Sequence, residues 1–327
     1  MKLKPTILLT GGAGYIGGHI ARELLDSGRR LVILDDLSTG DIRTVPSEAV
    51  FYENEIGDIS SLERIFTDHN IESVIHLAAV ASVPESVMDP VRCNKINHLD
   101  SALLMDASQS HGVSHFIFSS TSVVYDETCT PPFSEESSLA PLSPYAQTKL
   151  AAERHLSLKD EMRYVVLRYF NVGGADIRVG NRKRKDTTLI KSALECASGK
   201  RDCLEIYGTD YPTPDGTCIR DYIHVSDIAA AHVLALDYLQ AGGQSDIFNL
   251  GLQKGFSVRE VIDVAKSVTG IDFETRDAPR RESDPAHIFA DATKAHRVLG
   301  FKPKATTLNE IIADSWSWEL FERDSLK

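Results

Sequence analysis

The chain has 327 residues, of which 42% are hydrophobic and 25% charged, and its formal net charge at pH 7 is −12. This length predicts one large domain and a smaller one, and the composition is ordinary for a globular protein. The negative charge argues against nucleic-acid binding, which needs a basic surface. No apolar run approaches the roughly 18 residues of a membrane span, so no membrane association is expected.

Cysteine usage indicates a reducing compartment. The five cysteines are odd in number and form no C-x-x-C pair: Cys93, Cys129, Cys196, Cys203 and Cys218. This pattern is typical of reduced thiols, and the N-terminal apolar run is too brief for a secretory signal. There is also no compact His/Cys/carboxylate motif. The sequence therefore predicts a cytoplasmic protein without a metal.

Strand-like and helix-like patterns alternate along the first half of the chain. Strands are expected at residues 6–10, 31–34, 50–53, 73–78, 114–119 and 164–169, and helices at 15–27, 62–69, 91–111 and 145–157. The strands are nearly all apolar, which is typical of a parallel sheet covered by helices on both faces.

The alternation becomes looser after residue 171. Helices are expected near 187–198, at 225–239 (starting at Ser226 or Asp227), at 257–269 and at 307–321, and a strand at 247–250. One basic run is typical of a solvated loop, with an anion-contacting flap as the alternative: Arg178, Arg182, Lys183, Arg184 and Lys185. We predict an α/β protein with a Rossmann-type doubly wound parallel sheet in residues 1–170, to which 221–250 return, and a smaller C-terminal α/β domain in 171–327.

A glycine-rich turn follows the first expected strand. Gly11, Gly14 and Gly17 form G-x-x-G-x-x-G at the start of a helix. Such glycines permit positive φ and let backbone amides approach a pyrophosphate, while the helix N-terminus favours negative charge. Packing alone is the alternative reason for glycines here. Asp35 closes the second strand, where it can accept hydrogen bonds from a ribose and would repel a 2′-phosphate. The pattern predicts NAD rather than NADP, with the adenine near Asp58 and Ile59 after the third strand.

A tyrosine and a lysine lie one helical turn apart in SPYAQTK. Tyr145 and Lys149 share one helix face. A free tyrosine has a pKa of about 10, and a nearby ammonium together with a positive nicotinamide should lower it toward that of a usable base. An amphipathic helix with a solvated lysine is the alternative. The hydroxyl cluster at 119–122 favours catalysis.

The glycine spacing, LDDLSTG after the second strand and IHLAAVASVPES after the fourth resemble the extended short-chain dehydrogenase/reductase family. In the pattern of this family, the hydroxyl four residues before Tyr125 is that of Thr121. The Asp-Glu pair that follows this threonine in nucleotide-sugar dehydratases is replaced by Ser122 and Val123, which disfavours dehydration. The resemblance implies further cofactor contacts at Tyr15, Ile16, Asp36, Leu37, Ser38, Thr39, Gly40, Leu77, Ala78, Ala79, Ala81, Asn97 and Phe170, in addition to Tyr145 and Lys149.

The second half contains LRYFNVGGAD, LEIYGTDYPTPDGTCIRDYIHVSDIA and APRRESDPAHIFAD, which are similar to the UDP-sugar 4-epimerases of that family over about residues 4–320. The resemblance implies substrate contacts from Thr121, Tyr145, Asn171, Thr188, Leu189, Glu205, Ile206, Tyr207, Arg220, Arg281 and Asp284. Guanidinium groups suit a diphosphate because they form paired, charge-assisted hydrogen bonds. Surface ion pairs for the arginines and core packing for Tyr207 are the alternatives.

The implied activity is interconversion of UDP-glucose and UDP-galactose through a transient 4-keto sugar, with NAD staying bound. Alternatives are 4-epimerisation of another UDP sugar (UDP-xylose/UDP-arabinose, UDP-glucuronate or UDP-N-acetylhexosamine) and a non-catalytic NAD-binding protein. The chain departs from the family at Ala81, where a lysine is frequent, and at Thr188, where an asparagine is frequent. The resemblance also implies a homodimer that pairs the helices at 91–111 and 145–157.

Overall fold

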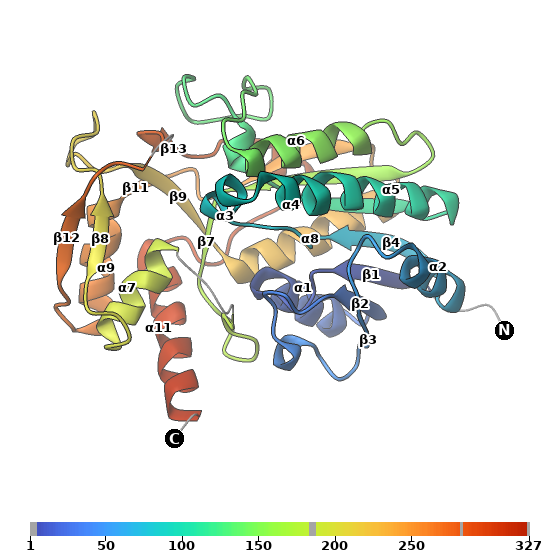
Figure 1. Ribbon diagram of the computed structural model, residues 1–327, viewed down its shortest axis with the longest axis horizontal. Coiled ribbons are helices and arrows are strands. Elements are labelled where there is room, and N and C mark those ends of the chain that lie inside the picture. Colours follow the sequence, from blue (N-terminus) through green and yellow to red (C-terminus); the bar gives the residue numbers. More distant parts are fainter. Residues whose placement is uncertain (1–4, 183–187, 282–283, 326–327) are drawn as a thin grey trace.

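A seven-stranded parallel sheet forms the larger part of the protein (Figure 1). The computed structural model describes residues 5–182, 188–281 and 284–325. The strand order is β10-β6-β5-β4-β1-β2-β3, and every neighbouring pair is parallel. The predicted α/β class is confirmed. The strands are β1 (Thr6–Thr10), β2 (Leu31–Asp35), β3 (Val50–Glu53), β4 (Ile71–His76), β5 (His115–Thr121), β6 (Arg163–Tyr169) and β10 (Asp246–Leu250).

Helices cover both faces of this sheet because successive strand residues point to opposite sides. Leu9 packs with α1 and α8 on one face, whereas Leu8 packs with α2, α5 and α6 on the other. Both leucines are fully buried. The elements along these faces are α1 (Tyr15–Asp26), α2 (Ile59–Asp68), α3 (Val83–Met88), α4 (Pro90–Asn94), the π-helical η2 (Lys95–Asp100), α5 (Ser101–Ser110), α6 (Pro144–Leu156) and α8 (Val225–Gln240), with short 3₁₀ turns η1 (Ile42–Thr44) and η3 (Ser122–Val124).

A smaller part lies beside the carboxyl ends of the central strands (Figure 1). In its four-stranded sheet, β9 pairs in parallel with β7 and β13 and antiparallel with β11, and β8 pairs with β12 separately. Three helices pack together into its core, α7, α9 and α11. The elements are β7 (Asn171–Gly173), α7 (Leu189–Ala197), β8 (Leu204–Tyr207), β9 (Ile219–His224), β11 (Gly255–Ser257), α9 (Val258–Thr269), β12 (Thr275–Ala278), β13 (His287–Ile288), α10 (Thr293–Val298) and α11 (Leu308–Ser325).

The structure differs from the expected elements in two details. The helix expected at 91–111 is divided by η2, a π-helical segment that apolar spacing does not reveal. As expected, α8 and β10 return to the large sheet, but residues 221–224 belong to β9 in the second sheet. The division of the chain at residue 170 stays a prediction. Part of the expected helix at 187–198, Thr187, lies outside the described residues.

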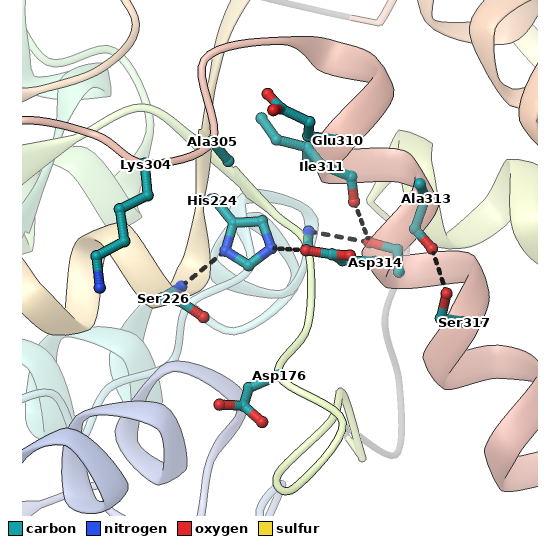
Figure 2. A network of polar contacts seen from close by, with 12 residues as sticks. Asp176, His224, Ser226, Lys304, Ala305, Glu310, Ile311, Ala313, Asp314 and Ser317 are labelled. Carbon is teal, nitrogen blue, oxygen red and sulfur yellow. Dashed lines mark hydrogen bonds and ion pairs between the residues drawn. The ribbon is translucent and has the colours of Figure 1, made fainter. Parts of the chain in front are cut away.

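The start of α8 is capped by a histidine rather than by Ser226 or Asp227. The backbone N–H of Ser226 donates to Nδ1 of His224 at 3.0 Å, and Nε2 of His224 lies 3.3 Å from a carboxylate oxygen of Asp314 on α11 (Figure 2). Asp227 instead accepts from the backbone N–H groups of Lys304 and Ala305. The helix begins at Val225 as expected, but neither Ser226 nor Asp227 is the residue that caps it.

The described part of the basic run is ion-paired and stacked rather than simply solvated. Arg178 pairs with Asp26 and Asp176, and the guanidinium of Arg182 lies 4.6 Å from the ring of Trp318. Lys183, Arg184 and Lys185 lie outside the described residues. Among the residues that the structure describes, no helix is both long and apolar enough to span a bilayer.

Phe248 on β10 tests how far the large core depends on the returning strand. Its side chain is fully buried among residues of β6 and α8, whereas Phe321 near the C-terminus is 48% exposed. We expect Phe248→Ala to lower the free energy of unfolding by about 3–5 kcal/mol, because it removes apolar burial and leaves a cavity. Urea denaturation measures this loss, with Phe321→Ala as the control. Equal losses in the two variants would contradict this role of β10.

Candidate active site

The carboxyl ends of the parallel strands bring the glycine-rich turn, Asp35, Thr121 and Phe170 to one edge of the large sheet. Ligands of open α/β sheets bind at such an edge. The turn after β1 is tight: a Cβ on Gly17 would lie 2.0 Å from the carbonyl oxygen of Gly11, and Gly11 has a φ of +72°. Gly14 immediately precedes α1 and brings no side chain to cap it. The backbone therefore offers a close, side-chain-free approach to a helix N-terminus, which suits a pyrophosphate.

Asp35 fixes the turn as well as closing β2. Its carboxylate accepts from the backbone N–H groups of Ala13 and Leu37, each at 2.9 Å. Burial raises the pKa of Asp35, and these two hydrogen bonds act in the opposite direction. Asp36 in turn accepts from the N–H and the hydroxyl of Ser38. The loop Asp36–Gly40 is thus held against the glycine-rich turn, where the adenosine end of a dinucleotide would lie.

Two predicted cofactor residues shape loops through their own contacts. The amide of Asn97 accepts from the N–H of Val80 at 2.7 Å and donates to its carbonyl at 3.0 Å, which fixes the segment after β4 that carries Leu77, Ala78 and Ala79. Asp58 accepts from the N–H of Ser61 at the start of α2. For both residues, a structural role is visible in the protein alone.

Helix α6 places Tyr145 and Lys149 against the end of β5. Ser143 caps the helix by accepting from the N–H of Ala146, and the N–H of Tyr145 donates to the hydroxyl of Ser86. The ammonium of Lys149 donates to the carbonyl of Ser119 at 2.9 Å and lies 4.7 Å from the ring of Phe118. Lys149 is buried, so the alternative of a solvated lysine does not hold.

The hydroxyls that precede Tyr145 have separate partners. The hydroxyl of Ser119 lies 3.0 Å from Nε2 of His232, and that of Ser120 donates to Glu153. Thr121 hydrogen-bonds with the phenol of Tyr145. The geometry therefore supports Thr121, the residue that the family pattern indicates, as the hydroxyl beside the tyrosine.

Burial dominates the electrostatics of this pair. It raises the pKa of Tyr145, against which the hydrogen bond from Thr121 acts only partly, and it lowers the pKa of Lys149 to about 8. In the protein alone the pKa of Tyr145 is thus raised, whereas the expected lowering depends on the positive nicotinamide together with Lys149. The free energy needed to remove a phenolate and an ammonium from water is larger than the stabilisation that the neighbouring groups provide here.

The predicted substrate residues form two contacting pairs beyond this edge. Arg220 on β9 donates to the carbonyl of Ile219 and forms an ion pair with Asp284. The guanidinium of Arg281 lies 3.9 Å from the ring centre of Tyr207, whose hydroxyl donates to Glu205 at 2.5 Å. Two arginines and one aromatic ring are thus grouped, as a nucleoside diphosphate would require.

The other predicted substrate residues lie on neighbouring elements. Asn171 is exposed on β7 and hydrogen-bonds with Tyr222, Thr188 directly precedes α7, and Leu189 is its first residue. Ile206 is buried in β8, so its side chain belongs to the core. Within the described ranges, no group of three His, Cys, Asp or Glu residues could hold a metal ion.

Sequence reasoning missed the polar groups behind the tyrosine–lysine pair. Glu153 on α6 and Arg168 on β6 are both buried and bind one another through two hydrogen bonds. Their only signal in the sequence was the four-residue spacing from Lys149 to Glu153 and a charged residue inside the otherwise apolar β6.

Comparison with known proteins shows the family of the chain. Residues 7–251 match the NAD dependent epimerase/dehydratase family. The UDP-glucose 4-epimerase of Halalkalibacterium halodurans is 43% identical over 317 residues, which cover 95% of this chain and 95% of that protein. A crystal structure of a UDP-glucose 4-epimerase has a TM-score of 0.94 at 40% identity, covering 98% of both chains.

A further solved structure was determined with ligands. The UDP-glucose 4-epimerase from Bifidobacterium longum, in complex with NAD+ and UDP, has a TM-score of 0.92 at 33% identity and covers 98% of this chain and 99% of that chain. The family match spans the glycine-rich turn and the tyrosine–lysine pair, and the similarity to relatives extends over nearly the whole chain. The chain therefore belongs to the NAD dependent epimerase/dehydratase family.

Proposed function

We propose that this protein interconverts UDP-glucose and UDP-galactose by inverting C4 of the sugar with tightly bound NAD. The observation that carries the proposal is the phenol of Tyr145, hydrogen-bonded with Thr121 and followed by the buried Lys149 at the sheet edge that holds the glycine-rich turn. Full-length relatives at about 40% identity are UDP-glucose 4-epimerases, which supports this sugar pair.

The cofactor would lie along the first sheet edge, with residues 1–170 as its domain. The close approach at Gly11 and Gly17 suits the pyrophosphate, and the carboxylate of Asp35 suits the ribose of NAD. When bound, NAD supplies the acceptor and donor of the hydride at C4. Because the cycle is redox-neutral, the cofactor has no need to exchange between turnovers.

Each of the three side chains then has one task. Tyr145 takes the proton of the 4′-hydroxyl and later returns it, Thr121 orients that oxygen, and Lys149 favours the phenolate by its positive charge. Since burial raises the pKa of Tyr145 in the protein alone, the positive nicotinamide is needed to move that pKa downward.

The nucleotide would be held by residues 171–327. Arg220 and Arg281 offer paired, charge-assisted hydrogen bonds to the diphosphate, Tyr207 offers a stacking surface to uracil, and Asp284 can accept from the ribose. Firm binding of the UDP end leaves the hexose less constrained. A 4-keto sugar can then turn and receive hydride on its opposite face.

The direct test is conversion of UDP-galactose by the purified protein. We expect UDP-glucose to form without added NAD or reductant, because the bound cofactor is regenerated in each cycle. Chromatography of the nucleotide sugars measures the product. A panel with UDP-xylose, UDP-glucuronate and UDP-N-acetylglucosamine separates the alternative sugar ranges, and inactivity on every sugar would instead support a non-catalytic NAD-binding protein.

A second test removes the proton acceptor. We expect Tyr145→Phe to lower kcat by about 10²–10⁴-fold, the range typical of general acid–base catalysis, while the protein keeps its bound NAD. Tyr238→Phe is the matched control, since Tyr238 packs against Phe248 on the opposite side of β6 from α6. Full activity of Tyr145→Phe would refute the role of the phenol.

We further propose that the protein forms a homodimer in the cytoplasm. Exposed apolar side chains gather on α3 and α4, where Met88 is 80% and Val91 is 79% exposed, next to α6. Pairing of these helices with those of a second copy would remove this apolar surface from water. The five cysteines are all free thiols, which is consistent with a reducing compartment.

Met88 and Val91 provide the test of this interface. We expect the double substitution Met88→Glu/Val91→Glu to convert a dimer into a monomer, because it would bury four carboxylates in the paired interface. Light scattering coupled to size-exclusion chromatography measures the mass. Ile177→Glu, at an exposed apolar residue on another segment, is the control. A wild-type monomer, or a dimer that survives the double substitution, would contradict the interface.

A further inference from the structure

Three side chains of α6 follow one another at four-residue intervals along the end of β5. Tyr145 hydrogen-bonds with Thr121, Lys149 donates to the carbonyl of Ser119, and Glu153 accepts from the hydroxyl of Ser120. Residues four apart lie on the same helix face. The proposed function uses the first two side chains and gives no task to the third.

Glu153 is fixed by more contacts than a surface carboxylate would be. Its side chain is 5% exposed and that of its partner Arg168 is 2% exposed. Arg168 donates from Nε to one carboxylate oxygen at 3.1 Å and from a terminal nitrogen to the other at 2.5 Å. The hydroxyl of Ser120 supplies another donor, so the carboxylate is held in one orientation.

Arg168 is itself held from the other side. It donates to the hydroxyl of Tyr125 at 3.2 Å, and that hydroxyl donates to Asn249 on β10 at 2.7 Å. The buried network thus joins α6 to three neighbouring strands of the sheet. A buried ion pair often adds little stability over an apolar replacement of the same shape, because both charges lose their hydration. Stability alone is therefore a weak reason for this pair.

The charges around Lys149 suggest another reason. The groups that face it are His76 on β4, Cys93 on α4, Ser119 on β5, Tyr145 and Glu153 on its own helix, and beyond Glu153 the guanidinium of Arg168. His76 is fully buried, and burial favours its neutral form by lowering its pKa to about 3. Glu153 is thus the carboxylate that balances the buried ammonium.

We propose that Glu153 is a positioning residue whose buried, Arg168-fixed carboxylate keeps Lys149 in its ammonium form beside Tyr145. This proposal rests on the proposed function in one respect: that function gives the ammonium of Lys149 a catalytic role. Burial lowers the pKa of Lys149 to about 8, and the attraction of Glu153 is the largest influence that opposes this shift. At that pKa, a modest change in the surrounding charge decides whether the amine is charged near neutral pH.

The test replaces the carboxylate by an amide of the same shape. In Glu153→Gln we expect the pKa of Lys149 to fall by about one unit or more, which raises the neutral fraction of the amine about tenfold at a pH well below that pKa. The 13Cε resonance of Lys149, assigned with a Lys149→Met variant, measures the titration without substrate. Because the ammonium is the active form, the alkaline limb of kcat/KM should move to lower pH by the same amount.

Two control variants separate charge from packing. Glu153→Asp keeps the charge and should retain an alkaline limb near that of the wild type. Ser120→Ala removes one hydrogen bond to Glu153 but leaves the ion pair, so it should also titrate like the wild type.

Glu153→Gln leaves Arg168 buried without its carboxylate and can fail to fold for that reason. The double variant Glu153→Gln/Arg168→Gln removes both charges, and the downward shift should persist because Glu153 is the group that acts on Lys149. An unchanged Lys149 titration in either folded variant, with only a loss of thermal stability, would overturn the proposal. Absence of epimerase activity in the wild-type protein would refute the proposed function. The titration of the Lys149 13Cε resonance would still decide whether Glu153 keeps Lys149 charged.

Discussion

The packing of α6 against the carboxyl end of β5 is the constraint on which the site depends. One helix face presents a phenol, an ammonium and a carboxylate to consecutive residues of one strand. The strand belongs to the same parallel sheet as β1, with β4 between them, so its end opens on the same edge as the glycine-rich turn. Strand ends and helix α6 thus position the residues proposed for chemistry and cofactor binding, and the smaller part of the protein carries most of those proposed for the substrate.

Loss of hydration dominates the electrostatics of the buried side chains where α6 packs against β5. Burial moves Tyr145 and Lys149 toward their neutral forms, the tyrosine by raising its pKa and the lysine by lowering its pKa to about 8. The protein alone therefore disfavours the charged pair that the chemistry needs. The positive cofactor of the proposed function and the buried carboxylate of Glu153 are two ways to restore those charges.

The fold was largely predictable because its signals are local. Apolar runs gave the six early strands of the large sheet, and the glycine spacing gave the turn after β1. The segment η2 was missed because a π-helical turn leaves no mark in apolar spacing, and the cap of α8 was missed because histidine is an unusual cap. Arg168 and Glu153 could not be paired from the sequence, since their contact depends on how a helix packs across two strands. Burial likewise decides the pKa of Tyr145, and burial is a property of the whole fold.

The ion pair between Arg220 and Asp284 has a consequence for how an anion enters the second site. A guanidinium that already has a carboxylate partner is electrically compensated, so it attracts a small anion less than an unpaired arginine would. A phosphate that takes this arginine must exchange with the aspartate or share the guanidinium with it. Only a ligand that also offers Asp284 a donor, such as a sugar hydroxyl, leaves both partners satisfied. If these residues bind the nucleotide as proposed, the pair would favour a ligand with a joined sugar and phosphate over either group alone.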